Sequence, residues 1–364
     1  APGRLPRNIL LHSECGFAID ILSIVACLAV IFLHCNGIVH WGPQTPHWSQ
    51  ALAVEVGFYW AVPIFFMCTG AKTLDYRDRK STKEFLVSRM KGIFVPFLAW
   101  IALLFIVKTS GVLGSAPDGW VLSLGSFIQA FMGSQIDGTY WFFFAMFGVT
   151  VSIPVLSCLR DHKYVLWYMV VVYTALYGCL VPLTRVFGIP WNDSIAIPVA
   201  GGYVMYVVLG CLLAKDDGAI LTPRRCKMLY VAGFAGLAVR YGYTWVMSQQ
   251  SGMVNTALFD YNFITAILPS AALFVFFKRV RWENISLLAS SGAKRAVRTL
   301  SGLTFGIYLL HNSMLTLLVQ VFSLDMTSYF VRLALPFVIF AMCSGISMLL
   351  NKIPVARGMV GGWR

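Results

Sequence analysis

Apolar segments long enough to cross a lipid bilayer recur along the whole chain. A helix needs about 20 apolar residues to span the hydrocarbon core, and the first such segment runs from about residue 16 to residue 39. The chain of 364 residues is 58% hydrophobic and only 12% charged. A water-soluble domain cannot bury that much apolar surface, so the composition predicts an all-α polytopic membrane protein.

Ten segments have the length and apolar character of transmembrane helices. They cover residues 16–39, 51–74, 92–114, 141–158, 164–182, 197–214, 228–247, 261–277, 302–322 and 328–350. The first segment is too long for a signal peptide and lacks a small-residue cleavage pattern. Because no connection is long enough for a separate soluble domain, we expect one integral-membrane domain over residues 1–364.

The basic residues are distributed unequally between the two sides of this ten-helix arrangement. Of the 28 Lys and Arg residues, all but Lys108, Arg185, Arg240 and Arg332 lie on the side that holds both termini. Cytoplasmic loops carry such an excess of Lys and Arg, so both termini are predicted to be cytoplasmic. Topology and attraction to anionic membrane lipid explain the net charge of +13, and no nucleic acid partner is expected.

The nine cysteines lie mostly within the predicted spans and are interpreted as small apolar residues. Neither the cysteines nor the histidines have the spacing of a zinc site. We therefore expect no metal and no tightly bound cofactor.

The first predicted span contains polar residues along one side. Asp20, Ser23, Cys27 and His34 fall within a narrow stripe of a helix, because successive residues turn by about 100°. That stripe must face protein or water rather than lipid. A histidine inside a span is costly to hold there and predicts a functional site. A polar contact between two helices is the simpler alternative.

A short outer loop, over residues 40–50, joins the first two spans and brings His34 and Glu55 to a similar depth near the outer leaflet. An imidazole whose second nitrogen is held by a carboxylate is a common arrangement for a general base. We predict His34 as the general base and Glu55 as its orienting partner. A structural contact between the two would look the same in the sequence.

Two further polar groups lie inside predicted spans. Arg240 needs a charged partner within the seventh span, and structural counter-charge is its commoner role. His311 lies in the ninth span, on the same helix face as Tyr308. A hydrogen bond between helices is the alternative to a functional role for His311. The acids on the side of Arg240 are Glu55, Asp193 and Asp260.

Three connections have unusual composition. The cytoplasmic segments 72–91 and 278–298 are densely basic. Topology and lipid attraction account for them, but Arg and Lys clusters also hold phosphates, so an anionic cytosolic ligand is the alternative. The outer segment 115–140 is nearly uncharged and rich in aromatic residues. We expect it to lie along the outer interface as an amphipathic helix above the cavity of the bundle.

Several short segments follow one another in an order that is similar to a known family. They are the first span ending in His34, YWAVPIFFMCTG at 59–70, SRMKGIFVPF at 88–97, YWFFFAMFG at 140–148, GGYVMYVVLG at 201–210 and FGIYLLH at 305–311. This order resembles the acyltransferase 3 family, in particular its branch of surface-polysaccharide O-acyltransferases. The resemblance covers nearly the whole chain.

The resemblance implies transfer of an acyl group, typically acetyl, from cytoplasmic acyl-CoA to a hydroxyl of an envelope carbohydrate or lipid-linked acceptor. It also implies a multi-pass protein of the bacterial cytoplasmic (inner) membrane, with acetyl-CoA as co-substrate. A homo-oligomer is compatible with this picture. The residues expected to bind acyl-CoA are Arg77, Arg79, Arg89, Lys91, Arg279, Arg295 and Arg298. Those expected to line the cavity or meet the acceptor are Ser23, Tyr140, Trp141, Arg240, Tyr308 and His311.

Two positions depart from the family pattern. Ser23 stands where members usually carry Arg or Lys, and Thr139 and Tyr140 precede Trp141 where a histidine is usual. The role of the missing basic residue would pass to Arg89, Lys91 or another loop cation. The alternatives to an active enzyme are a catalytically altered relative and a proton-coupled transporter or exporter that uses the intramembrane charges.

Overall fold

The computed structural model describes residues 7–111, 117–192, 194–195 and 200–353. Within these ranges the chain is helical and contains no β-strand, which confirms the all-α prediction. The helices are α1 (Arg7–Cys35), α2 (Trp48–Phe58), α3 (Ala61–Thr73), α4 (Thr82–Arg89), α5 (Val95–Thr109), α6 (Leu124–Met132), α7 (Trp141–Cys158), α8 (Lys163–Tyr173), α9 (Val181–Val186), α10 (Val204–Lys215), α11 (Pro223–Ser251), α12 (Ile264–Arg279), α13 (Ser286–Ala289), α14 (Ser291–Val321) and α15 (Leu335–Lys352).

Seven helical segments of the described chain are long and apolar enough to cross a membrane, which establishes a multi-pass membrane protein. They are Cys15–Trp41, Trp48–Asp78, Thr82–Thr109, Gly138–Cys158, Lys163–Val186, Ser291–Val321 and Phe330–Lys352. The other three predicted spans fall on α10, α11 and α12. The count of ten stays a prediction, as does the side of each terminus, because length and composition support seven spans and do not assign a side to either end of the chain.

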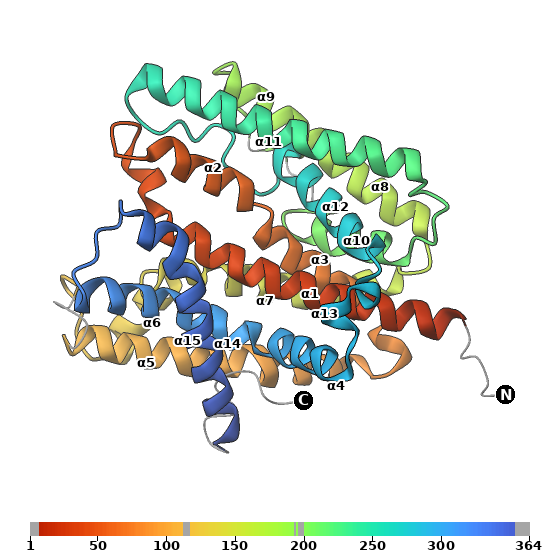
Figure 1. The fold of residues 1–364 in the computed structure, drawn as a ribbon, viewed down its shortest axis with the longest axis horizontal. Coiled ribbons are helices and arrows are strands. Elements are labelled where there is room, and N and C mark those ends of the chain that lie inside the picture. The colour runs from red at the N-terminus through yellow and green to blue at the C-terminus, as the bar shows by residue number, and fades with distance from the viewer. Residues whose placement is uncertain (1–6, 112–116, 193, 196–199, 354–364) are drawn as a thin grey trace.

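Most of the long helices run side by side, with α1 through the middle of the bundle, α11 along one edge and α5 along the opposite edge, whereas α15 crosses them steeply (Figure 1). Helix α1 contacts α3, α12, α14 and α15, and its buried side chains include Leu22, Ala26 and Ile31. A helix surrounded in this way has no side free for lipid over most of its length. Its polar stripe therefore faces protein, as the sequence predicted.

The predicted second span is divided into two helices, α2 and α3, with the break at Tyr59 and Trp60. Pro63 lies in the first turn of α3, where a missing N–H leaves no hydrogen bond unmade. Trp60 donates its indole N–H to the Gly57 carbonyl at 2.5 Å, which holds the break in shape. Because of the break, the axis of α2, which carries the buried Glu55, differs in direction from the axis of α3.

Helices α3 and α10 pack closely enough that only glycine fits at their crossing. A Cβ atom on Gly70 would lie 1.9 Å from the Val207 carbonyl oxygen, and one on Gly210 would lie 2.1 Å from the Met67 carbonyl oxygen. Membrane helices use small residues in this way because van der Waals packing drives their association. Cys68 and Thr69, which lie next to this crossing on α3, help to line the cavity described below.

The segment predicted to lie on the outer side contains helix α6, which is at the end of the bundle opposite α4 (Figure 1). Leu124, Ile128 and Met132 are exposed along one of its faces, while Phe127 and Phe131 pack inward near the rings of α5. An exposed apolar face on a short helix at the end of a bundle is typical of a helix at the membrane interface. The amphipathic helix expected within 115–140 is therefore present.

Candidate active site

Two histidines from distant parts of the chain meet near the end of α1. The ring centres of His34 on α1 and His311 on α14 are 5.1 Å apart, with the rings tilted by 40°. His34 is half-buried and His311 is 1% exposed. The sequence predicted both residues as functional, and the structure shows that they form a pair.

The hydrogen bond of His311 defines which nitrogen can accept a proton. Its Nδ1 lies 2.6 Å from the Tyr308 carbonyl oxygen, which can only accept, so Nδ1 carries the hydrogen. Its Nε2 is buried and has no hydrogen-bond partner within the described chain. The neutral ring therefore presents a free lone pair at Nε2, as a proton acceptor requires.

A tight turn at the start of α7 packs against the His311 segment of α14. Asp137 accepts hydrogen bonds from the Thr139 N–H at 2.9 Å, the Thr139 hydroxyl at 2.7 Å and the Asn312 amide at 3.0 Å. The Tyr308 hydroxyl donates to the Thr139 carbonyl at 3.2 Å. The Tyr140 hydroxyl donates to the Leu309 carbonyl at 2.7 Å. These bonds attach residues 137–140 to residues 308–312.

Sequence reasoning missed Asp137, which is 5% exposed and is bonded to Asn312, the residue after His311. The signal was present, because Asp137 is one of two acids in an otherwise nearly uncharged outer segment. A buried carboxylate is retained in a protein only when it is hydrogen-bonded or paired. Its position next to two histidines makes it part of the candidate site.

Glu55 lies elsewhere, beside Arg240 of α11. Glu55 is 7% exposed, and within the described chain it makes no ion pair with His34. Its charged neighbour is Arg240. The orienting role of Glu55 stays a prediction, and the contact on which it was based is absent.

Arg240 is completely buried between aromatic rings. Its guanidinium carbon lies 3.4 Å from the Tyr59 ring centre and 4.8 Å from the Phe259 ring centre. None of its three guanidinium nitrogens has a hydrogen-bond partner among the described residues. Of the other acids considered for it, Asp193 lies outside the described ranges. The electrostatic neighbour of Arg240 is Glu55, and the rings provide cation–π contacts.

A cavity of about 230 Å³ lies between α1, α3, α7 and α14. Tyr308 and Ser23 line it, and the Ser23 hydroxyl donates to the Ile19 carbonyl at 2.8 Å. Lys72 and Arg89 also line it, so the cavity joins cations to the cluster around His311. Its remaining lining residues are Phe65, Cys68, Thr69, Thr73, Ile93, Phe142, Phe143, Met146, Thr150, Thr304 and Phe305.

A family model for an acyltransferase domain matches residues 17–351. The chain belongs to the acyltransferase 3 family. It is therefore an acyltransferase, and the match includes both histidines and the whole cavity lining. Searches of curated proteins and of solved structures found no match to the chain.

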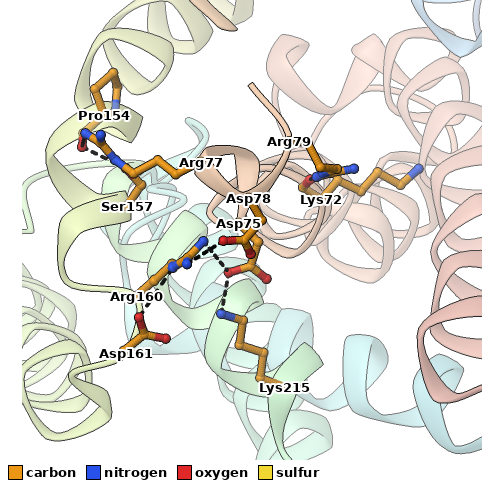
Figure 2. A network of polar contacts seen from close by, with 10 residues as sticks. All are labelled: Lys72, Asp75, Arg77, Asp78, Arg79, Pro154, Ser157, Arg160, Asp161 and Lys215. Carbon is orange, nitrogen blue, oxygen red and sulfur yellow. Dashed lines mark hydrogen bonds and ion pairs between the residues drawn. The ribbon is translucent and has the colours of Figure 1, made fainter. Parts of the chain in front are cut away.

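In this acyltransferase, two of the arginines predicted to bind acyl-CoA are engaged with the protein itself (Figure 2). Arg77 donates from Nε to the Ser157 hydroxyl at 2.7 Å and from Nη2 to the Pro154 carbonyl at 3.1 Å. Arg79 donates to the Lys72 carbonyl at 3.3 Å. Such bonds fix the chain around α3 and α7, and they leave these guanidinium groups less available for a ligand.

The same region holds an ion-pair network that joins three parts of the acyltransferase (Figure 2). Asp75 pairs with Lys215 at 2.6 Å, and Arg160 pairs with Asp78 at 2.5 Å. A longer contact of 3.9 Å links Arg160 to Asp75. The network ties the segment after α3 to the α7–α8 turn and to the end of α10. Exposed ion pairs are individually weak, and they contribute to stability mainly when several charges form a network, as they do here.

The remaining predicted site residues of the acyltransferase differ in their surroundings. Arg279 donates to the Leu221 carbonyl at 2.6 Å, whereas Lys91, Arg295 and Arg298 are exposed. Trp141 does not line the cavity, and its ring centre is 5.6 Å from those of Tyr203 and Tyr261. Arg89, which is half-buried, is the predicted donor-binding arginine that the structure places at the cavity.

Proposed function

We propose that this acyltransferase moves an acetyl group from cytoplasmic acetyl-CoA to a hydroxyl of a cell-envelope sugar or lipid-linked acceptor, with His34 as the general base. The cavity carries the proposal. Lys72 and Arg89 line it together with Tyr308, and the ring centre of Tyr308 is 5.2 Å from that of His311. A cavity that holds cations and reaches Tyr308, the neighbour of His311, suits a donor with anionic phosphates and a reactive thioester.

The size of the cavity supports a divided donor site. Pockets that enclose a drug-sized ligand measure about 300–1,000 Å³, and this cavity measures about 230 Å³. The narrow pantetheine arm would enter it, and the nucleotide would stay on the basic cytoplasmic surface. Ser23 and His34 are separated by about 16 Å along α1, a distance that such an extended arm is suited to cover.

The reaction needs one proton acceptor near the thioester. As the acceptor hydroxyl oxygen attacks the thioester carbonyl carbon, its proton moves to His34. The carbon–sulfur bond then breaks, and the coenzyme A thiolate takes the proton back from His34. The same base would serve direct transfer or transfer through an acyl-enzyme, because either route deprotonates a nucleophile.

The position of Ser23 does not remove positive charge from the cavity. Lys72 and Arg89 line the cavity together with Ser23, and can supply the charge that the family usually carries at that position. Lys72 is also paired with Asp20 at 2.9 Å, which leaves Arg89 as the less engaged of the two cations. This arrangement supports an active enzyme over an inactive relative.

The proposal includes the setting that the sequence predicts. Ten spans with cytoplasmic termini, within one integral-membrane domain of the bacterial inner membrane, would place Arg89 on the inner side and His34 toward the outer leaflet. Acetyl-CoA would then approach from the cytoplasm and the acceptor from the envelope. Arg295 and Arg298, exposed on the first turns of α14, are further contacts proposed for the nucleotide.

Labelled acetyl-CoA tests the function directly. Purified protein in lipid nanodiscs is incubated with acetyl-labelled CoA and envelope extract, and both thioester loss and label transfer are followed. His34→Ala should lower transfer by about 10²–10⁴-fold, because a general base contributes that much. His162→Ala, at the start of α8, is the matched control and should retain the wild-type rate. Absence of protein-dependent label transfer by the wild type would reject the proposal and favour a transporter or an inactive relative.

A further inference from the structure

Asp137 is a buried carboxylate whose hydrogen-bond donors are all neutral. The three groups that donate to it are the Thr139 N–H, the Thr139 hydroxyl and the Asn312 amide. Within the described chain it makes no ion pair. Neutral donors hold the carboxylate in place but leave its negative charge uncompensated, and a buried charge of this kind interacts strongly with whatever charge arises nearby.

The turn that carries Asp137 is fixed against the histidine pair. Asn312, which donates to both carboxylate oxygens at 3.0 Å, is the residue after His311. Two tyrosine hydroxyls add hydrogen bonds between the same segments. The ring of His311, next to Asn312 in the chain, lies 5.1 Å from the ring of His34. The carboxylate is therefore held next to the place where the general base would gain a proton.

We propose that Asp137 is a positioning residue that stabilises the positive charge on the His34–His311 pair when the pair accepts the proton of the acceptor hydroxyl. The inference rests on the proposed function for its catalytic meaning. In the step itself, the proton moves from the hydroxyl to His34, and the Asp137 carboxylate would stabilise the resulting imidazolium. The charge disappears again when the coenzyme A thiolate takes the proton.

The other charged groups around the pair have the wrong sign or another partner. His40, when it is protonated, would repel a positive charge on the His34–His311 pair. Lys108 donates to the Ile136 carbonyl at 2.6 Å, and Arg332 of the π-helical segment Phe330–Ala334 donates to Asn36 at 3.1 Å. Glu55 has Arg240 as its charged neighbour. Asp137 is therefore the acid that we expect to stabilise a positive charge on the histidines.

The test is a titration of the histidines rather than an activity assay. Protein labelled with ¹⁵N-histidine in nanodiscs is titrated by NMR, and the signals of the pair are identified by their loss in His34→Gln and His311→Gln. Asp137→Asn removes the negative charge and should lower the midpoint of the pair by about one pH unit or more. Thr139→Val removes one hydrogen bond but keeps the carboxylate, so it should leave the midpoint in place.

A double variant separates charge from folding. Asp137→Asn combined with Asn312→Asp exchanges carboxylate and amide across their hydrogen bond, and should restore the wild-type midpoint even where the single variant folds poorly. An unchanged midpoint in Asp137→Asn, or an equal shift in Thr139→Val, would overturn the proposal. So would a shift produced by Glu55→Gln but not by Asp137→Asn. The titration needs neither donor nor acceptor, so a failed transfer assay would reject the proposed function while leaving this coupling intact.

Discussion

The two fully buried arginines of this acyltransferase differ in how their charge is satisfied. Arg332 donates from Nε to the Asn36 side-chain oxygen at 3.1 Å, and Asn36 donates back to the Arg332 carbonyl at 3.0 Å. Arg240 has aromatic rings on its guanidinium but no hydrogen-bond acceptor among the described residues. Arg332 and Asn36 thus hold each other by two hydrogen bonds at the end of α1, close in sequence to His34. Arg240 is a desolvated charge.

This difference predicts opposite responses to substitution by methionine. Arg332→Met should lower stability by about 1–3 kcal/mol, because Asn36 is left with an unpaired buried oxygen. Arg240→Met combined with Glu55→Gln should leave the unfolding temperature unchanged or raise it, because the buried cation and its charged neighbour are both replaced by neutral side chains. Thermal unfolding of purified protein in detergent compares the two. An equal loss in both variants would show that Arg240 has a hydrogen-bonded partner in the membrane.

The sequence singled out His34 and paired it with Glu55, but the described residues contain no ion pair between the two. His34 was identifiable because a histidine within an apolar run is rare. Glu55 was chosen by depth alone, and depth does not determine the direction in which a side chain points. Asp137 lies in a turn outside the predicted spans, and only tertiary hydrogen bonds bring it to the histidines.

At the scale of helices, the crossing of α3 and α10 is the least tolerant contact. Gly70→Ala should destabilise the fold by about 1–3 kcal/mol or prevent insertion, because the new Cβ would overlap backbone atoms, which cannot rotate away. Gly148→Ala on α7 is the control, since nothing lies within 4 Å of its Cβ position. Unfolding in detergent, measured for both, should separate them clearly. Similar stability of the two variants would contradict the observed packing.

Helix boundaries were less predictable than helix existence. The break between α2 and α3 falls at Tyr59 and Trp60, which are neither Gly nor Pro, so the apolar run 51–74 conceals it. Helix α14 begins at Ser291, well before the predicted start at residue 302. Arg295 and Arg298 ended the apolar window there, although arginine is a good helix former. Hydropathy detects only the part of a helix that lies in lipid, so it misses the turns of α14 that extend beyond the lipid.

At the scale of the whole molecule, the structure divides the basic residues by availability. Arg89→Gln should weaken coenzyme A binding about tenfold, because a charge-assisted contact to phosphate is lost at the cavity. Arg77→Gln should change affinity little and stability more, since that guanidinium is bonded to Ser157 and Pro154. Calorimetry with coenzyme A at low and high salt is the measurement. Affinity should fall with salt, as exposed charges are screened within about 10 Å at 0.1 M. If the affinity for coenzyme A changes neither with salt nor in Arg89→Gln, the cavity is not the donor-binding site.

Because Lys72, Arg89 and Tyr308 all line one cavity, the proposed donor and the product it leaves behind would occupy the same place. Free coenzyme A keeps every phosphate and the whole arm, and lacks only the acyl group. It should therefore inhibit competitively against acetyl-CoA, and raising the acceptor concentration should not relieve the inhibition. Initial-rate measurements that vary each substrate at fixed coenzyme A would reveal this pattern. The rate of the enzyme in a cell would then follow the ratio of acetylated to free coenzyme A rather than the amount of donor alone.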